Sequence, residues 1–261
     1  MRQQALAGLL TATVLRGVAC AEEANEKDTW AARAQAGYSK TGGTTDTSSA
    51  NALFHIAHIA GDWKLLFGID GLYGSTKGET TAQAWSVRGQ VNYNFTERFY
   101  WYSGASYIDD RFSGFAYQTL VSTGVGYQFV KTDATKLAAQ VGVGARWLKP
   151  QILTQDAVGG IISVTDLPGE NDVVLDGAVK LEHSLNDATK FIAAVTVHSG
   201  RENTMTSALA QLQVKMTEGL SLAAGYQLVH NSQPPPGAGS SSSLTTLNLV
   251  YEHKNKDLAP E

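Results

Sequence analysis

The segment from Thr81 to Phe95 constrains the fold more than any other part of this chain. Its side chains alternate between an almost entirely apolar set and a polar set. The apolar set is Trp85, Val87, Gly89, Val91, Tyr93 and Phe95, and the polar set is Ser86, Arg88, Gln90, Asn92 and Asn94. Successive side chains of a strand point to opposite faces, so the pattern predicts a β-strand that separates an apolar environment from a wet one.

The same alternation returns over residues 117–129 and 137–147. Strands of about ten residues that alternate in this way, divided by turn residues, are typical of a transmembrane β-barrel. A soluble barrel shows the same period, but its polar face normally carries many Lys and Glu residues. Here the polar faces of the three strands hold Gln, Asn, Ser, Gly and Ala, and only Arg88 and Arg146 are charged. We therefore favour a membrane barrel over a soluble periplasmic barrel that binds lipid.

The chain as a whole predicts an antiparallel up-and-down transmembrane β-barrel of about twelve strands. We expect the strands at residues 30–40, 49–60, 63–74, 81–95, 99–109, 116–130, 137–148, 171–184, 190–198, 204–216, 220–230 and 244–253. Their connections alternate between short turns and longer loops, which indicates a periplasmic rim with both termini and an extracellular rim. The two longest loops are expected at 149–170 and 231–243. Residues 231–243 are rich in Pro and Ser and predict a mobile loop that does not pack a core.

The N-terminus has the composition of a secretory signal peptide. Arg2 precedes a mostly apolar run, which ends in the small residues Ala19, Cys20 and Ala21. We expect cleavage after Ala21, and keep lipidation at Cys20 as the alternative. The predicted organisation is then a signal peptide at 1–21, a periplasmic lead-in at 22–29, the outer-membrane barrel at 30–253 and a polar tail at 254–261.

Composition limits the remaining classes of protein. The chain has 261 residues, of which 17% are charged, and its net charge is −4. These values do not match a disordered protein, and a mildly acidic chain argues against binding to nucleic acid. After the signal peptide there is no apolar run long enough for a spanning helix, so a membrane role requires a closed barrel. All five tryptophans lie near predicted strand ends, which predicts aromatic girdles at two membrane interfaces.

A family resemblance supports this interpretation. The sequence from Tyr107 to Gly114, together with the Gly124–Tyr127 segment, resembles the salt-induced outer membrane protein family, which is also defined as domain of unknown function 481. The family's Gly-Asn-Thr-Asp-Thr loop is similar to residues 43–47, with a departure at Thr44, and its tryptophan at the start of the third strand matches Trp63. The resemblance implies an outer-membrane barrel of uncharacterised activity. The tail that follows Tyr251 departs from the family's usual aromatic end.

The candidate site is a polar network inside the barrel. Because side chains alternate between the two faces of a strand, the position of a residue along its strand predicts its face, and we call this criterion parity. Parity predicts that seven charged residues face the lumen: Arg88, Arg146, Asp176, Lys180, Glu182, Lys215 and Glu252. Mixed signs favour a paired network that narrows the lumen, and the alternative is a selective pore lining. Asp109, Asp110 and Arg111 form a second cluster, which we interpret as a salt-bridged extracellular turn.

Catalytic residues are not evident in the sequence. His198 and Ser199 are adjacent, so they point to opposite faces of a strand, and so do His55 and His58. We therefore predict no catalytic residues, no metal site and no cofactor. The expected role is envelope structure or a narrow passage for ions and small solutes in the bacterial outer membrane. An outer-membrane enzyme with a site at the rim stays the alternative. The expected partners are outer-membrane lipid and the barrel-assembly machinery.

Overall fold

The computed structural model describes residues 29–41 and 46–256. Its strands are β1 (Thr29–Thr41), β2 (Thr47–Ala60), β3 (Trp63–Thr76), β4 (Glu79–Asn94), β5 (Phe99–Asp110), β6 (Phe115–Lys131), β7 (Thr135–Gln155), β8 (Ile161–Asp166), β9 (Glu170–Ser184), β10 (Thr189–Ser199), β11 (Thr204–Lys215), β12 (Leu220–Asn231) and β13 (Ser241–Lys256). Within the described ranges, no helix is long and apolar enough to cross a membrane. The predicted signal peptide, residues 22–28 of the lead-in and residues 257–261 of the tail lie outside the described residues.

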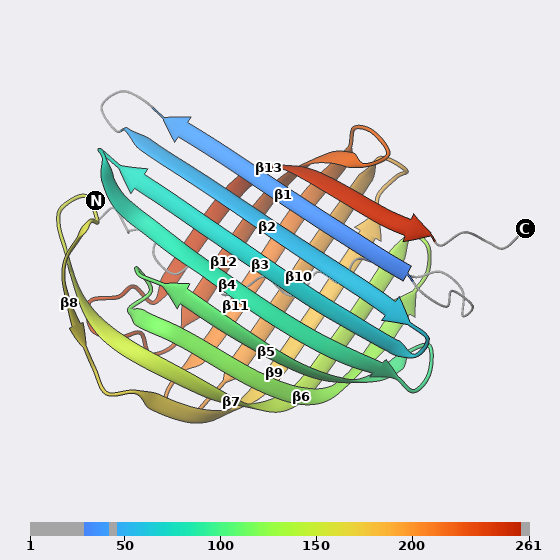
Figure 1. The fold of residues 1–261 in the computed structure, drawn as a ribbon, viewed down its shortest axis with the longest axis horizontal. Helices are drawn as coiled ribbons and strands as arrows, with labels where there is room; N and C mark the ends of the chain where they lie inside the picture. Colours follow the sequence, from blue (N-terminus) through green and yellow to red (C-terminus); the bar gives the residue numbers. More distant parts are fainter. Residues whose placement is uncertain (1–28, 42–45, 257–261) are drawn as a thin grey trace, which may run out of the picture.

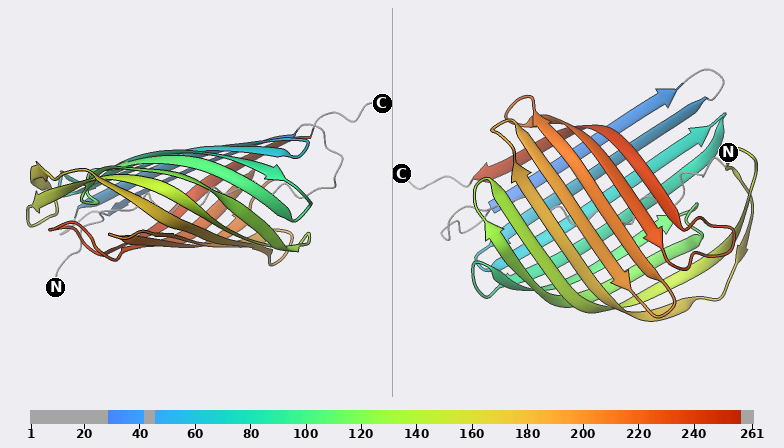
Figure 2. Two further views of the ribbon diagram at one scale, coloured as in Figure 1. Left: turned by 90° about the horizontal axis from the view of Figure 1, so that it is seen from below. Right: turned by 180° about the vertical axis from the view of Figure 1, so that it is seen from behind.

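The strands form a closed antiparallel barrel (Figure 1). Neighbours in sequence pair from β1 to β7 and from β9 to β13, and the ring closes through the β7–β9 and β1–β13 pairs. The short strand β8 pairs with the last residues of β7, outside the ring. The predicted up-and-down barrel of twelve strands is therefore confirmed. Seen edge-on, the barrel is flattened, and the wall from β1 to β7 lies over the wall from β9 to β13 (Figure 2).

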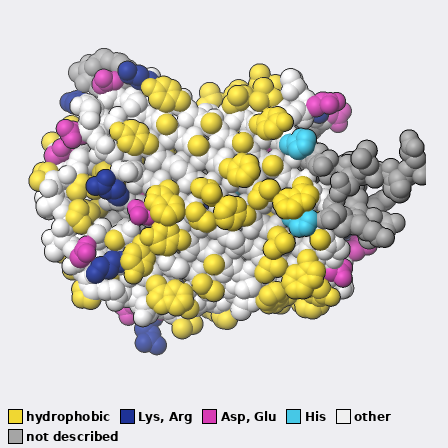
Figure 3. All heavy atoms as spheres, viewed as in Figure 1, with side chains coloured by type: hydrophobic (Ala, Val, Ile, Leu, Met, Phe, Trp, Pro, Cys, Tyr) yellow, Lys and Arg dark blue, Asp and Glu magenta, His cyan; other side chains and the backbone are white. Residues whose placement is uncertain are grey.

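Side chains alternate across the wall as the sequence predicts. On β4, Ser86 and Arg88 are 0% and 7% exposed and face the interior, whereas Trp85 is 46% exposed. Val141, Val173 and Leu175 on the outer face reach 60%, 76% and 62% exposure. Apolar side chains cover the middle of the face in Figure 3, and charged side chains gather toward its ends. The barrel thus has a polar interior and an apolar exterior.

We name the two ends of the barrel by their connections. The turn end holds the start of β1, the end of β13 and the turns at 61–62, 95–98, 132–134, 185–188 and 216–219, and the other end is the loop end. Exposed aromatic rings pair near both ends. Trp30 stacks on His58 at the turn end with ring centroids 4.1 Å apart, and Trp85 lies 5.3 Å from Tyr107 nearer the loop end.

Two predicted loops at the loop end are wrong. The chain over 149–170 is largely a hairpin, because β7 continues to Gln155 and β8 pairs with it. Residues outside the ring need not alternate, so the pattern used for the wall misses them. The strands predicted at 63–74 and 81–95 leave a loop of six residues between them, but the structure has a two-residue turn there, in which Lys77 and Gly78 have φ of 53° and 87°. Two successive positive φ values suit the twist of a tight hairpin.

The connection from β12 to β13, residues 232–240, packs against other loops at the loop end. Pro235 is buried. A Cβ added at Gly114 would lie 2.9 Å from the Cβ of Ala238, and one at Gly237 would lie 2.9 Å from the carbonyl oxygen of Leu153. The expectation that this segment does not pack is wrong, because its small residues and prolines fit closely without forming a strand. We call this contact, with the buried side chains of Phe112 and Phe115, the loop-end cap.

The β1–β13 seam is paired over only part of its length. The ladder runs from Thr29↔Lys256 to Ala36↔Leu249. Beyond it, β1 stays with β2, whereas residues 241–248 of β13 stay with β12. Seen from behind, β13 bends away from β1 toward the loop end (Figure 2). Leu244 on the bent part packs against an apolar cluster on the inner face of β3 and β4, namely Leu72, Ala82 and Ala84.

Candidate functional site

Three of the seven residues predicted to face the lumen are deeply buried. Arg88, Arg146 and Asp176 are 7%, 2% and 5% exposed. The other four lie nearer the turn end: Lys180, Glu182 and Glu252 are partly buried, and Lys215 is exposed. Lys180 pairs with Glu182, but most of these residues pair with groups outside the set of seven.

Arg88 belongs to a buried cluster on the inner face of β2, β3 and β4. Its guanidinium donates to Asp70 Oδ2 at 2.8 Å and to Ser86 Oγ at 2.7 Å. His55 Nε2 lies 3.1 Å from the other carboxylate oxygen of Asp70. Asp70 and His55 are each 2% exposed. The ion pair is therefore shielded from solvent, and its carboxylate also receives a hydrogen bond from Ser86 Oγ.

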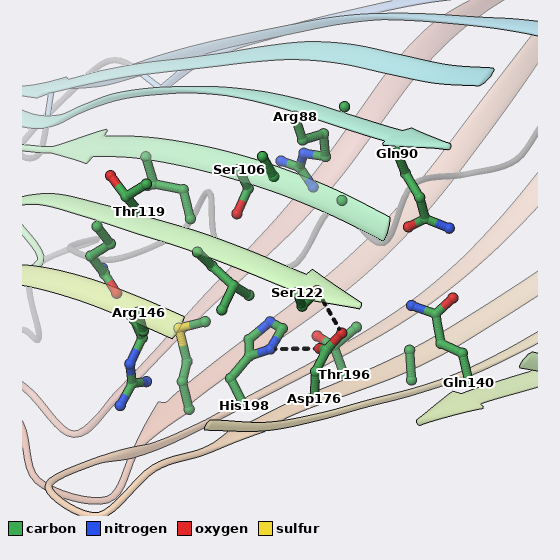
Figure 4. Close-up of a pocket in the computed structure, with 18 residues that line it drawn as sticks. Arg88, Gln90, Ser106, Thr119, Ser122, Gln140, Arg146, Asp176, Thr196 and His198 are labelled. Carbon is green, nitrogen blue, oxygen red and sulfur yellow. Dashed lines mark hydrogen bonds and ion pairs between the residues drawn. The ribbon is translucent and has the colours of Figure 1, made fainter. Parts of the chain in front are cut away.

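Asp176 is the centre of a second cluster, built from β5, β6, β9 and β10. Figure 4 shows Ser122 and His198 beside its carboxylate. The hydroxyls of Tyr102 and Ser122 donate to its Oδ2 at 2.7 Å and 3.0 Å. His198 Nδ1 lies 2.9 Å from Oδ1. Asp176 and His198 face each other on neighbouring strands, whereas Tyr102 reaches the carboxylate from three strands away.

Glycines allow Tyr102 to reach Asp176. Gly124 and Gly142 pair across β6 and β7 and lie between Tyr102 and Asp176 in the ladder. A Cβ at Gly142 would lie 2.5 Å from the Tyr102 hydroxyl and 2.3 Å from the carbonyl oxygen of Thr123. Both distances are too short for a real contact, so the Tyr102–Asp176 hydrogen bond requires glycine at this position.

We expect Gly142→Ala to lower the free energy of unfolding by about 1–3 kcal/mol, because the new methyl displaces Tyr102 and the backbone. Gly71→Ala is the matched control, since a Cβ at Gly71 meets nothing within 4 Å. The control should be neutral or slightly stabilising. Urea unfolding followed by tryptophan fluorescence measures both variants, and equal values would contradict the role given to Gly142.

Arg146 holds the connection between β10 and β11. Its Nη2 donates to the carbonyl oxygen of Asn203 at 2.7 Å and lies 3.3 Å from Asp172 Oδ2. The Asn203 side chain in turn donates to Asn231 Oδ1 at 3.0 Å. The turn at 200–203 is thus joined to the wall through the buried guanidinium of Arg146.

A third group of charges lies toward the turn end. Arg33 forms an ion pair with Glu252 and donates to Gln213 Oε1 at 3.0 Å. Arg33 lies on β1 and Gln213 on β11, so this group connects strands that are not neighbours. Beside it is a cavity of about 210 Å³, which we call the vestibule, lined in part by Lys215 and Glu252.

A second cavity, the inner chamber, lies among the buried clusters and has a volume of about 140 Å³. Its polar lining includes Arg88, Ser106, Gln118, Gln140, Thr196 and His198 (Figure 4). Ile108, Leu120, Ala178 and Met205 supply apolar surface. The lumen therefore contains two separate spaces at different depths, with charged clusters beside each.

Residues 109–111, the predicted salt-bridged turn, lie at the end of β5 and the start of the turn that follows. Arg111 donates to Gln83 Oε1 at 2.9 Å. Asp110 is 2% exposed and accepts a hydrogen bond from the backbone of Phe112 at 3.0 Å. Asp110 is the last residue of β5, and its carboxylate is buried beneath the turn.

The buried histidines do not form a catalytic pair with a serine. In both clusters the carboxylate lies between the two groups: Ser86 and His55 each bond to Asp70, and Ser122 and His198 each contact Asp176. A serine nucleophile needs the imidazole itself within hydrogen-bond reach. Within the part of the chain that the structure describes, no group of three or more His, Cys, Asp or Glu residues could hold a metal ion.

The sequence did not indicate which groups contact the charged residues predicted in the lumen. The missed residues of these clusters are Arg33, His55, Asp70, Asp172 and His198. Parity gives a signal for Asp172, which is four residues from Asp176 and so shares its face. It gives less for Asp70, because both faces of β3 are largely apolar and the strand does not show which face is inner.

The chain is similar to several proteins of known sequence or structure. The solved structure of the translocator domain of the autotransporter NalP from Neisseria meningitidis aligns with 86% of this chain and 87% of that chain, at 15% identity and a TM-score of 0.45. A structure of the NanC porin aligns with 87% of this chain and 100% of that chain, at 12% identity and a TM-score of 0.43. The uncharacterized protein YdiY of Escherichia coli strain K12 is 25% identical over 234 residues, which is 88% of this chain and 86% of YdiY.

A family model described as "Protein of unknown function, DUF481" matches residues 34–253. The match includes the Tyr107–Gly114 segment and confirms the family resemblance found in the sequence. The chain therefore belongs to the DUF481 family, whose function is unknown.

Proposed function

We propose that this protein spans the bacterial outer membrane as a barrel with a closed lumen and serves as a structural element of the envelope. The supporting observation is the polarity of the wall. Arg33, Asp70, Arg88 and Arg146 are buried inside, whereas valines and leucines are exposed outside. A barrel that carries lipid through water would have the reverse polarity. An apolar exterior with aromatic residues near both ends suits a bilayer.

Closure of the lumen rests on two features. Charged clusters that join distant strands occupy the interior, and the loop-end cap buries Phe112, Phe115 and Pro235 at the outer mouth. Twelve strands permit either a filled or an open interior, because filled barrels have about eight strands and aqueous channels about sixteen. Here the paired charges favour the filled interior.

Purified full-length protein in planar bilayers should give no regular conductance steps. The Arg146→Glu variant should also give no regular conductance steps. It should lower the free energy of unfolding by about 3–5 kcal/mol, because the new carboxylate would be buried beside Asp172. Heat-modifiable migration of the protein recovered from vesicles is the control for insertion. Regular, ion-selective steps from the unmodified protein would contradict closure.

A narrow passage is the second candidate function. The observation in its favour is the presence of the inner chamber and the vestibule, which provide space at two depths. If the protein is a narrow passage, the unmodified protein should conduct ions in planar bilayers, and the Arg146→Glu variant should conduct with a different ion preference. The same bilayer recordings therefore separate the two candidates.

A further inference from the structure

The inner chamber presents neutral polar groups that lack protein partners. Among the described residues, the side chains of Ser106, Gln118 and Gln140 make no hydrogen bond to another protein group. Thr196 Oγ1 is fully buried and also has no partner. Buried polar groups are normally hydrogen-bonded, so Thr196 Oγ1 requires water or a solute in the chamber, and the other three side chains are free to bond the same molecule.

Charged groups of both signs line the chamber. Arg88 lies 2.8 Å from Asp70 and Arg146 lies 3.3 Å from Asp172, and Asp176 is contacted by Tyr102, Ser122 and His198. In the described part of the chain, Arg88 Nε and Arg146 Nε and Nη1 have no hydrogen-bond partner, and a hydroxyl oxygen can accept from such groups. An anion in the chamber would approach the carboxylate of Asp176. A cation would approach two guanidinium groups. An uncharged solute avoids both repulsions.

The unpartnered groups also define which neutral solute fits. Amides and hydroxyls all both donate and accept hydrogen bonds, and so does an alcohol. Ile108, Ala178 and Met205 offer apolar surface to carbon atoms. The volume of about 140 Å³ corresponds to about five water molecules at ~30 Å³ each. We propose that the inner chamber binds a small neutral polyol of three or four carbons.

Saturation-transfer NMR on the full-length protein in detergent micelles tests this proposal with erythritol as the probe. The wild-type protein should give a saturable signal. Gln140→Leu keeps most of the side-chain volume but removes the amide, so it should weaken the apparent affinity about 3- to 10-fold. This experiment does not depend on the proposed membrane location. It requires that erythritol exchanges between solvent and the chamber in micelles, which the absence of regular conductance steps does not prevent, so the two tests can fail independently.

Gln227→Leu is the matched control. Gln227 is a partly buried glutamine on β12 that does not line the chamber, so this variant should bind erythritol as the wild type does. Heat-modifiable migration establishes that each variant is folded. Equal signals from all three proteins, or no signal from folded wild type, would overturn the proposal. Competition by acetate at the same concentration would overturn the choice of a neutral ligand.

Discussion

Val141→Arg should lower the free energy of unfolding of the membrane-inserted barrel by about 2–4 kcal/mol. Val141 is 60% exposed on the outer face of β7, where it pairs with Val125 and Gly177 of the neighbouring strands. An arginine there would replace contact with lipid chains by a charge near the middle of the apolar belt. Equilibrium urea unfolding in phosphatidylcholine vesicles measures the loss.

The matched control is the adjacent residue on the opposite face. Gln140→Arg places the same side chain in the lumen. Gln140 is only partly buried and lines the inner chamber together with the carboxylate of Asp176, so the new charge has both space and an opposite charge nearby, and we expect a loss below about 1 kcal/mol. Ser122 is less suitable as a control, because it donates a hydrogen bond to Asp176 at 3.0 Å. Equal losses for the two arginine variants would show that the inner and outer faces are assigned wrongly.

Arg88→Ala should destabilise the barrel by about 3–5 kcal/mol, because it leaves the carboxylate of Asp70 buried without its cation. Asp70 is 2% exposed, and the guanidinium is its nearest positive charge at 2.8 Å. Replacing both members should behave differently. Arg88→Met combined with Asp70→Leu removes both charges and should recover most of the loss.

The same unfolding assay decides between two views of this cluster. If Arg88→Ala lowers the free energy of unfolding by less than about 1 kcal/mol, water must reach Asp70, which would contradict a filled lumen at this depth. A double variant as unstable as the single one would mean that His55 and Ser86 depend on the carboxylate for their own positions.

The sequence predicts the barrel wall well because the wall obeys one rule. Between lipid and a polar lumen, the side-chain environment changes with the period of the strand, and Thr81–Phe95 shows that period directly. The rule also places Arg88, Arg146 and Asp176 on the inner face. It fails beyond the ring: neither the β7–β8 hairpin nor the packing of Pro235 follows from alternation, since both depend on contacts at the loop end.

The partners of the luminal charges could not be predicted for a different reason. A charge in a narrow lumen pairs with whatever lies across or along the wall, and this depends on register and shear. Tyr102 reaches Asp176 across Gly124 and Gly142, and Arg33 reaches Gln213 across β12 and β13. Such contacts join strands that are distant in the sequence, so parity gives the face of each residue but not its neighbour.

The divergence of β1 from β13 has a consequence for the surrounding lipid. Hydrocarbon cannot satisfy backbone groups that have no strand beside them. Within the described residues, the β1–β13 ladder stops at the Ala36↔Leu249 pair, whereas the β7–β9 ladder continues to Leu148↔Glu170. For the proposed membrane barrel, polar headgroups and water would therefore descend along the open part of the seam wherever it lies within hydrocarbon. The barrel would then thin the leaflet that surrounds its loop end on this side only, and lipid packing around it would be asymmetric.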